Sequence, residues 1–336
     1  MGITKSVLVI GRQRTRKHQR LFSDSAFSCF GHPLDQVPAW MLTSLRMESP
    51  RACPDTSVIT VLNLKGGVGK THTAWMLASV CQERGKRVLL VDTDTQGNLS
   101  SSFLECANTV SGVEMLLHPG SDRNPAPLVR RTLFSHIDII PSSAAVARFD
   151  RSDKSDWEKT DLHRCFVDPI QILRAKYDYI VFDCPPRLSL VSFAALAASD
   201  AIVIPMETAD WGAQGIEQVT GAVRYVQKKY NPRLALLGYL PSRHKQGRLY
   251  HKVYLASLRK HYGALAFDTV IPDLAAFERA VTDRIPITIH APRSRAAAIA
   301  RQLFDEVEAR LEKHRSGGKP VSRPGVFKKT AIGAAA

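Results

Sequence analysis

The chain has 336 residues, of which 44% are hydrophobic and 23% charged, a composition that excludes a disordered or fibrous protein. It has no apolar run long enough to predict a membrane-spanning helix, and its six cysteines form no C-x-x-C pair, which argues against a metal knuckle and fits reduced thiols. The net charge of +15 favours a polyanionic partner, either nucleic acid or an anionic membrane face, and a merely solvated basic surface is the alternative.

Residues 1–56 show no sustained helical or strand pattern. A short apolar run precedes the basic segment RQRTRKHQR, which is the reverse of the order in a secretory signal. An Arg-rich, acid-poor leader could also be a transit peptide, and Met47 offers a second start for translation. We expect residues 1–56 to lie outside the fold, either as a disordered extension or as a segment that is not translated.

Strand and helix patterns alternate from residue 57 onward. Continuous apolar runs predict buried strands at 58–64, 87–92, 137–141, 179–183, 201–205 and 234–240. Amphipathic stretches predict helices at 71–84, 162–176, 189–198 and 212–230, with later helices at 248–262 and 294–314 around a Pro-bounded segment, 271–292. Repeated βα units predict an α/β fold, a mostly parallel twisted sheet with helices on both faces. The predicted domain is 57–314, followed by a disordered basic tail, 315–336.

A glycine-rich loop follows the first predicted strand and opens the first helix. Its sequence, K-G-G-V-G-K-T, comprises Lys65, Gly66, Gly67, Val68, Gly69, Lys70 and Thr71, and His72 follows in the first helical turn. Backbone N–H groups of such a loop converge on phosphate oxygens, and the helix N-terminus adds its positive dipole end. Lys70 is placed to contact the β- and γ-phosphates, and the Thr71 hydroxyl is placed to ligate Mg²⁺. We therefore predict that residues 65–72 bind a nucleotide.

The common phosphate-loop pattern needs a glycine where this chain has Leu64, so the loop is a variant with an additional lysine. Together with VLLVDTDTQGN, YDYIVFDCPP and the C-terminal stretch that begins VIPD, it resembles the ParA/MinD family of P-loop ATPases over residues 57–311. The resemblance implies that Lys65 crosses a dimer interface to the phosphates of the other subunit. Two ATP molecules would then lie between two copies of the chain.

The same resemblance implies roles for two carboxylates. Asp94 would orient the attacking water, which makes Lys65, Lys70 and Asp94 the expected catalytic residues, and Asp92 would lie near the Mg²⁺ shell. Thr95 stands where the family has proline. Independently, Asp183 ends a strand beside the loop, where a carboxylate can hold a Mg²⁺-bound water; a helix N-cap is the alternative.

Two further positions follow from the resemblance to the family. Backbone around an Ile-Pro turn helps to seat the adenine, which points to Pro272 and Asp273. Cys184 could indicate the related nitrogenase iron protein, but no second cysteine has a suitable motif, and we interpret Cys184 as a small buried residue.

Positive charge is concentrated between residues 228 and 267, which include nine Lys and Arg and no Asp or Glu. Arg248, Lys252 and Arg259 share one face of the predicted helix and could contact DNA phosphates without reading sequence. The family often has an arginine at the start of this helix, as at Arg248, and Arg293 and Arg295 could supply a second basic site that residues 274–276 lack. An inert basic surface and RNA contact remain alternatives.

The expected function is a weak Mg²⁺-dependent ATPase that forms an ATP-bound homodimer, binds double-stranded DNA nonspecifically and partitions plasmid or chromosome DNA. The resemblance implies a ParB-like partner and a location in the cytoplasm on the nucleoid. Slow hydrolysis is expected because no arginine finger is evident, and the acid-rich last helix disfavours membrane attachment. The alternative is a positioning ATPase that localises a pilus, chemoreceptor or division complex. A metabolic phosphotransferase would need an acceptor site, and none is visible.

Overall fold

The computed structural model describes residues 55–105, 111–118, 121, 123–150, 161–208, 213–245 and 247–317. The predictions made for 1–54 and 318–336 lie outside the described residues. Thr56, expected outside the fold, is buried, and its hydroxyl donates to the carbonyl oxygens of Arg174 (2.5 Å) and Tyr177 (2.7 Å). The folded part of the chain therefore includes at least Thr56, one residue before the predicted start of the domain.

A seven-stranded sheet in the order β3-β4-β2-β5-β1-β6-β7 forms the centre of the described chain. Its strands are β1 (Ser57–Val61), β2 (Val88–Asp92), β3 (Arg130–Arg131), β4 (Ile137–Ile140), β5 (Tyr179–Asp183), β6 (Ala201–Glu207) and β7 (Ala235–Ser242). Every pairing is parallel except that of β3 with β4. The six predicted strands are confirmed. The two-residue β3 was not predicted, because so short a segment shows no periodicity.

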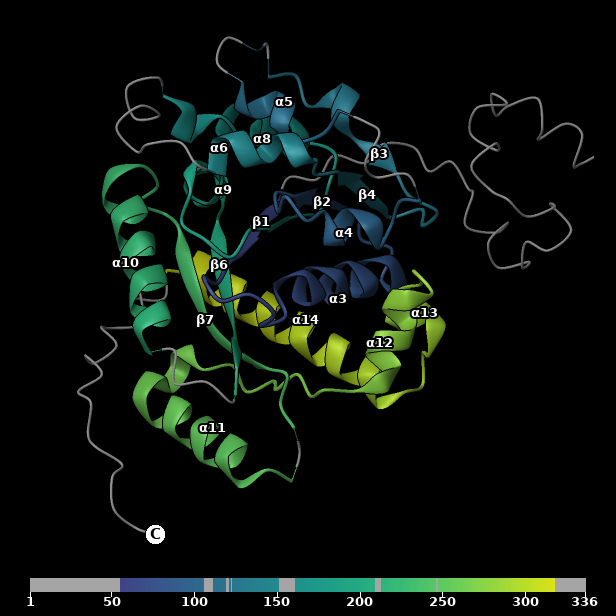
Figure 1. The fold of residues 1–336 in the computed structure, drawn as a ribbon, viewed down its shortest axis with the longest axis vertical. Helices are drawn as coiled ribbons and strands as arrows, with labels where there is room; N and C mark the ends of the chain where they lie inside the picture. Colours follow the sequence, from purple (N-terminus) through teal and green to yellow (C-terminus); the bar gives the residue numbers. More distant parts are fainter. Residues whose placement is uncertain are drawn as a thin grey trace, which may run out of the picture. The chain divides into compact units, whose positions relative to one another are not determined.

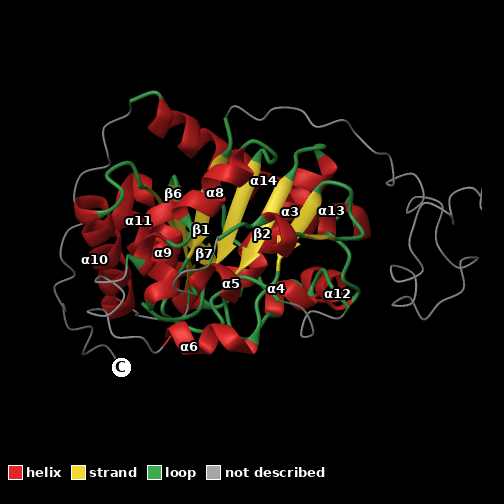
Figure 2. Cartoon of the chain, turned by 90° about the horizontal axis from the view of Figure 1, so that it is seen from above, coloured by secondary structure: helices red, strands yellow, loops and turns green. Residues whose placement is uncertain are grey.

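Helices cover both faces of this sheet, as Figures 1 and 2 show, and the predicted α/β class is confirmed. They are α3 (Lys70–Glu83), α4 (Asn98–Ser101), α5 (Glu114–Leu117), α6 (Ala147–Asp150), α8 (Val167–Arg174), α9 (Leu190–Ala198), α10 (Ala213–Lys229), α11 (Leu249–Tyr262), α12 (Ala275–Thr282), α13 (Ile287–His290) and α14 (Arg295–Arg315). No helix of the described residues has the length and apolar character needed to cross a membrane.

Two hydrophobic clusters fill the space between the sheet and its helix layers. One packs α5, α8, α9 and α10 against the sheet, and the other packs α3, α12, α13 and α14 against the opposite face. Strands β1, β2 and β5 are buried along their whole length. Burial on both faces explains why these strands are continuous apolar runs and do not alternate apolar with polar residues.

The parallel register brings the carboxyl ends of three strands to one edge of the sheet. Asp183 at the end of β5 lies opposite Val61 of β1 on one side and opposite Asp92 of β2 on the other. The loop that leaves β1 therefore begins beside two carboxylates. In open α/β sheets this edge is where ligands bind.

Candidate nucleotide-binding site

The loop between β1 and α3 has the backbone of a phosphate-binding loop. Gly67 (φ 74°) and Gly69 (φ 93°) adopt left-handed conformations that side chains rarely tolerate. Gly69 caps α3 and, as a glycine, offers no side-chain oxygen to the first N–H groups of this helix. These donors, together with the helix dipole, are available to an anion.

Lys70 begins α3 and turns back over the loop. Its side chain is buried, and Nζ donates to the carbonyl oxygen of Lys65 at 3.0 Å. Burial lowers the pKa of Lys70, while the negative charges of Asp183 and Asp94 act in the opposite direction. An ammonium that is costly to bury is thus held where a phosphate group could neutralise it.

Lys65 lies at the mouth of the loop, where 45% of its side chain is exposed. Its Nζ is 3.0 Å from Oε2 of Glu207, the last residue of β6. Its backbone N–H donates to Oδ1 of Asn63, whose side-chain amide in turn donates to the Pro205 carbonyl oxygen. The loop is therefore tied to β6, and the additional lysine is paired within its own protomer.

Asp183 is a buried carboxylate, 1% exposed, whose two oxygens have no hydrogen bond of good geometry among the described residues. Burial raises the pKa of Asp183 well above its usual range and the Asp92 carboxylate adds to the shift, while the Thr71 hydroxyl and the Lys70 ammonium oppose it. A cation with bound water would supply the missing partners. The described residues contain no cluster of three metal-ligating side chains. Mg²⁺ usually takes only one or two protein ligands and completes its shell with phosphates and water, so Asp183 and Thr71 fit it.

Asp92, predicted to lie near the Mg²⁺ shell, is hydrogen-bonded within the loop that follows β2. Its Oδ2 accepts hydrogen bonds from the backbone N–H (2.8 Å) and the hydroxyl (2.7 Å) of Ser100, and its Oδ1 accepts from the N–H of Asp94 (3.1 Å). Burial raises the pKa of Asp92 to about 6, although these hydrogen bonds oppose the shift. Both oxygens are used within the loop that follows β2. In this structure Asp92 therefore positions Asp94 and α4, and it lies opposite Asp183 on the neighbouring strand.

Asp94 lies in a tight turn that ends at α4. The N–H of Gly97 donates to its carbonyl oxygen at 2.9 Å, and the N–H of Gln96 donates to its Oδ1 at 3.1 Å. The carboxylate is half-buried, and its charge affects Lys70, Asp92 and Asp183. The structure thus places Asp94 with the phosphate loop, as the sequence predicts.

Residues at the end of β7 also contact the phosphate loop, although no local pattern in the sequence indicates them. The Ser242 hydroxyl donates to the carbonyl oxygens of Val68 and Met206. Arg243 adopts a left-handed backbone (φ 51°), and its Nη1 donates to the Gly67 carbonyl oxygen at 3.1 Å. The strained backbone aims this guanidinium at the loop. Ser242 and Arg243 could be found only once β7 is known to lie beside β6.

The residues predicted to seat the adenine, Pro272 and Asp273, lie beside the segment that follows β7. The segment after β7 pairs with the Ile-Pro turn through a parallel bridge between His244 and Pro272. The N–H of Asp273 donates to the His244 carbonyl oxygen at 3.2 Å, and the Asp273 carboxylate is 3.8 Å from the Lys245 ammonium. Pro272 and Asp273 are therefore joined to the segment that carries Arg243.

His72, predicted among the nucleotide contacts, packs away from the loop against aromatic rings. Its imidazole stacks on Trp75 at a centroid distance of 5.7 Å and meets the Phe277 ring edge-on at 4.5 Å. Burial lowers the pKa of His72 to about 4, so the side chain is neutral near pH 7. The structure gives His72 a packing role between α3 and α12.

The predicted DNA-binding residues divide into two groups. Arg248, Lys252 and Arg259 are exposed on or beside α11, whose opposite face is buried. Arg293 and Arg295 are exposed at the start of α14, directly after α13, and Figures 1 and 2 place α13 on the side of the sheet away from α11. The two groups therefore do not form one continuous surface, because α14 starts at the opposite side of the molecule.

Comparison with known proteins identifies the family. A family model described as an AAA domain matches residues 56–236. The sporulation initiation inhibitor protein Soj of Bacillus subtilis is 32% identical over 254 residues, which cover 75% of this chain and 98% of Soj. The chromosome-partitioning ATPase Soj of Thermus thermophilus is 31% identical over 261 residues, covering 76% of this chain and 96% of that protein.

Solved structures agree with these sequence matches. Cobyrinic acid a,c-diamide synthase from Mycobacterium smegmatis, with bound ADP and magnesium, has a TM-score of 0.64 and 25% identity, covering 81% of this chain and 99% of its own. Its nucleotide and metal are of the kind that the phosphate loop and Asp183 fit. On the model match and the identity to Soj, the chain belongs to the ParA/MinD family of P-loop ATPases.

Proposed function

We propose that the protein is an ATP-dependent switch that dimerises around two ATP·Mg²⁺ molecules, binds double-stranded DNA nonspecifically and drives partition of plasmid or chromosome DNA with a ParB-like partner. Its relatives include chromosome-partitioning ATPases. The observation that carries the proposal is Lys65, a lysine at the open mouth of the phosphate loop in addition to the buried Lys70. One ammonium suffices for the loop's own phosphates, so the other can serve a second subunit.

Each residue of the site would have a defined part in this switch. Backbone N–H groups of the loop and the Lys70 ammonium would hold the triphosphate, while Thr71 and Asp183 would hold Mg²⁺, which neutralises charge on the β- and γ-phosphates when bound. Asp94 would orient the attacking water. Lys65 would leave Glu207 and pair with the phosphates of the partner subunit. Release of the dimer would follow hydrolysis.

The exposed side of α11 supports the DNA-binding part of the proposal. Arg248 and Lys252 lie near its start, and Arg259 lies two turns further along. The hydroxyl of Tyr250 accepts a hydrogen bond from Arg248 at 2.6 Å, which holds the guanidinium at the surface. Side chains of this kind contact phosphates, and their number sets the salt dependence of binding.

DNA affinity measured by fluorescence anisotropy across a salt series tests this assignment. The wild-type chain should bind a nonspecific duplex more tightly with ATP than with ADP. Replacing Arg248 and Lys252 by alanine should weaken that binding at least tenfold and reduce the slope of log K against log salt by about two, roughly one for each phosphate that is no longer neutralised. Lys313→Ala, a change of an exposed lysine on α14, is the matched control. Equal affinity in ATP and ADP would exclude nonspecific DNA as the regulated partner.

A second function, the positioning of a protein complex, is favoured by one observation. The start of α11 exposes large apolar side chains, Leu249 (75%), Tyr250 (50%) and Val253 (49%), which phosphate contact does not require. Grouped exposed apolar residues are typical of protein interfaces. A chain that dimerises with ATP but shows no ATP-dependent DNA binding would support this alternative.

A further inference from the structure

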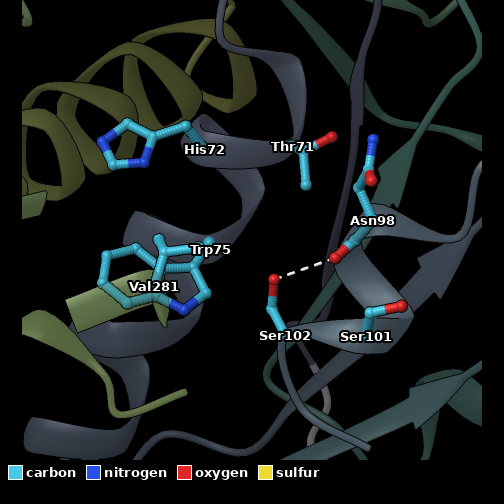
Figure 3. Close-up of a pocket in the computed structure, with 7 residues that line it drawn as sticks. All are labelled: Thr71, His72, Trp75, Asn98, Ser101, Ser102 and Val281. Atoms are coloured by element: carbon cyan, nitrogen blue, oxygen red, sulfur yellow. Dashed lines mark hydrogen bonds between the residues drawn. The ribbon is translucent and has the colours of Figure 1, made fainter. Parts of the chain in front are cut away.

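The two ends of the phosphate loop are anchored by neighbouring residues of the chain. At the first end the carbonyl oxygen of Lys65 accepts a hydrogen bond from the Lys70 ammonium (3.0 Å). At the other end the Gly69 carbonyl oxygen accepts from the N–H (2.9 Å) and the hydroxyl (2.8 Å) of Thr73 in α3. Figure 3 shows how the chain continues from there, with Thr71 in the first turn of α3. Residues 66–68, between these anchors, belong to no helix or strand.

Contacts to this middle part come from the end of β7. The Ser242 hydroxyl donates to the Val68 carbonyl oxygen, and Nη1 of Arg243 donates to the Gly67 carbonyl oxygen at 3.1 Å. Two successive peptide groups of the loop are therefore held by two successive residues at the strand end. Gly66 and Gly67 have more backbone freedom than other residues, so without such contacts this part of the loop would be costly to order around a ligand.

The direction of the two carbonyl groups also sets the direction of two N–H groups. In a trans peptide the C=O of one residue and the N–H of the next point to opposite sides, and the described residues contain no cis peptide bond. Since Gly67 and Val68 turn their carbonyl oxygens toward the end of β7, the N–H groups of Val68 and Gly69 point away from it. Phosphate loops bind anions through successive backbone N–H groups. Arg243 can thus act on the anion site without touching the anion.

Arg243 occupies its place with an unfavourable backbone conformation. Its φ of 51° is left-handed, a conformation that asparagine and glycine adopt more readily than arginine. The fold fixes the backbone on both sides of it. The Ser242 carbonyl oxygen accepts from the N–H of Thr208 (3.2 Å), and the N–H of His244 donates to the Ile271 carbonyl oxygen (3.0 Å). An arginine where the backbone favours asparagine indicates that the guanidinium has a function at this place.

We propose that Arg243 is a positioning residue of the nucleotide site. Its guanidinium fixes the peptide group between Gly67 and Val68 and so presents the Val68 N–H to a phosphate group of the nucleotide. A donor that is already in place need not be ordered when the ligand binds, and the benefit is expected mainly in slower release. This role rests on the nucleotide-binding part of the proposed function and requires neither DNA nor a second subunit. ADP and ATP should both depend on it, because one loop serves either nucleotide.

Replacement of Arg243 by asparagine separates positioning from folding. Asparagine removes the guanidinium but suits the left-handed backbone, so the nucleotide-free variant should resist denaturant as well as the wild-type chain or better. A fluorescent ADP analogue, followed by stopped flow, should dissociate from the variant at least tenfold faster. Arg243→Lys, which keeps a cationic donor, should restore part of the wild-type rate. Should Arg243→Asn not fold, Arg243→Gly removes the same group without restricting the backbone.

Arg284→Asn is the matched control. Arg284 is an exposed arginine with nearly the same backbone conformation (φ 56°), but it lies between α12 and α13. The same replacement there changes the charge and the backbone preference equally and removes no contact with the phosphate loop. It should leave the release of the ADP analogue unchanged.

Amide ¹⁵N–¹H signals of Val68 and Gly69 in the nucleotide-free chain report on the loop directly. They should shift in Arg243→Asn and keep their positions in Arg284→Asn. Unchanged ADP release from Arg243→Asn would overturn the proposal. Faster release with unmoved loop signals would also overturn it, because the charge alone would then act. A loss of stability in both Arg243→Asn and Arg243→Gly would do the same, since Arg243 would then support the fold as a whole. A wild-type chain that binds no nucleotide would refute the proposed function, and this role with it.

Discussion

Lys65 and Glu207 form an ion pair at the start of the phosphate loop. The pair lies 3.0 Å apart with both side chains partly exposed, and exposed ion pairs contribute only about 0–1 kcal/mol. So weak a contact cannot prevent Lys65 from moving to a triphosphate, but it competes with that move. Glu207 thus restrains Lys65 in the isolated protomer.

Glu207→Gln should therefore lower the ATP concentration needed for half-maximal dimerisation, by up to about fivefold for a pair of this strength. Light scattering after size exclusion, across an ATP series, measures the change. Glu217→Gln removes an exposed acid from α10 and is the matched control. A higher ATP requirement in Glu207→Gln would contradict the competition between Glu207 and the nucleotide.

Asp94 is the residue to which we assign water orientation, and its turn is held by its own backbone contacts and by Asp92. Asp94→Ala should leave ATP binding and dimerisation intact and reduce phosphate release by about 10²-fold or more, as expected when the group that positions the attacking water is removed. Single-turnover phosphate release measures the rate, and thermal unfolding checks the fold. Unchanged turnover would refute the assigned role.

Among the elements, β7 combines a structural irregularity with contacts to the site. The register between β6 and β7 shifts between Ile202 and Val203, where Gly238 stands on the facing strand with a φ of 145°. A Cβ on Gly238 would lie 2.1 Å from the carbonyl oxygen of Leu265. The strand then continues to Ser242, which contacts the phosphate loop. The path of β7 past Leu265 thus requires glycine.

Gly238→Ala should lower the free energy of unfolding by about 3 kcal/mol, because backbone atoms of the segment around Leu265 must move. Denaturant unfolding measures the change. Gly221→Ala is the matched control, since no neighbour lies within 4 Å of its Cβ position in α10, and there alanine should stabilise the helix by up to about 1 kcal/mol. Equal stability of the two variants would show that the backbone around Leu265 can move away from the new Cβ at little cost.

For the whole molecule, the central expectation is that nucleotide joins two copies of the chain. Lys65→Ala should still bind ATP, because Lys70 and the backbone N–H groups of the loop remain, but should no longer dimerise with it. Binding of a fluorescent ATP analogue and light scattering report the two properties separately. Lys86→Ala, which changes an exposed lysine just beyond the end of α3, is the control. An ATP-dependent dimer of Lys65→Ala would count against the shared site.

Local patterns in the sequence determined the kind of fold and the phosphate loop. Apolar runs predicted six of the strands because burial on both faces leaves no polar positions, and the glycines with Lys70 and Thr71 identified the loop because only such a segment can wrap a phosphate. The placement of Asp183 also followed from the sequence, since a carboxylate at the end of a buried parallel strand must lie at the ligand edge of the sheet.

Only the tertiary structure decided how distant segments meet at that loop. Glu207, Ser242 and Arg243 reach it because β6 lies next to β1 and β7 lies next to β6. Their positions along the chain, far from the loop, carry no local signal. The contacts of Asp92 with Ser100 and of the His72 ring with Phe277 are likewise decided by tertiary packing. Periodicity reports which face of an element is buried, but which side chains become partners depends on the order of the strands.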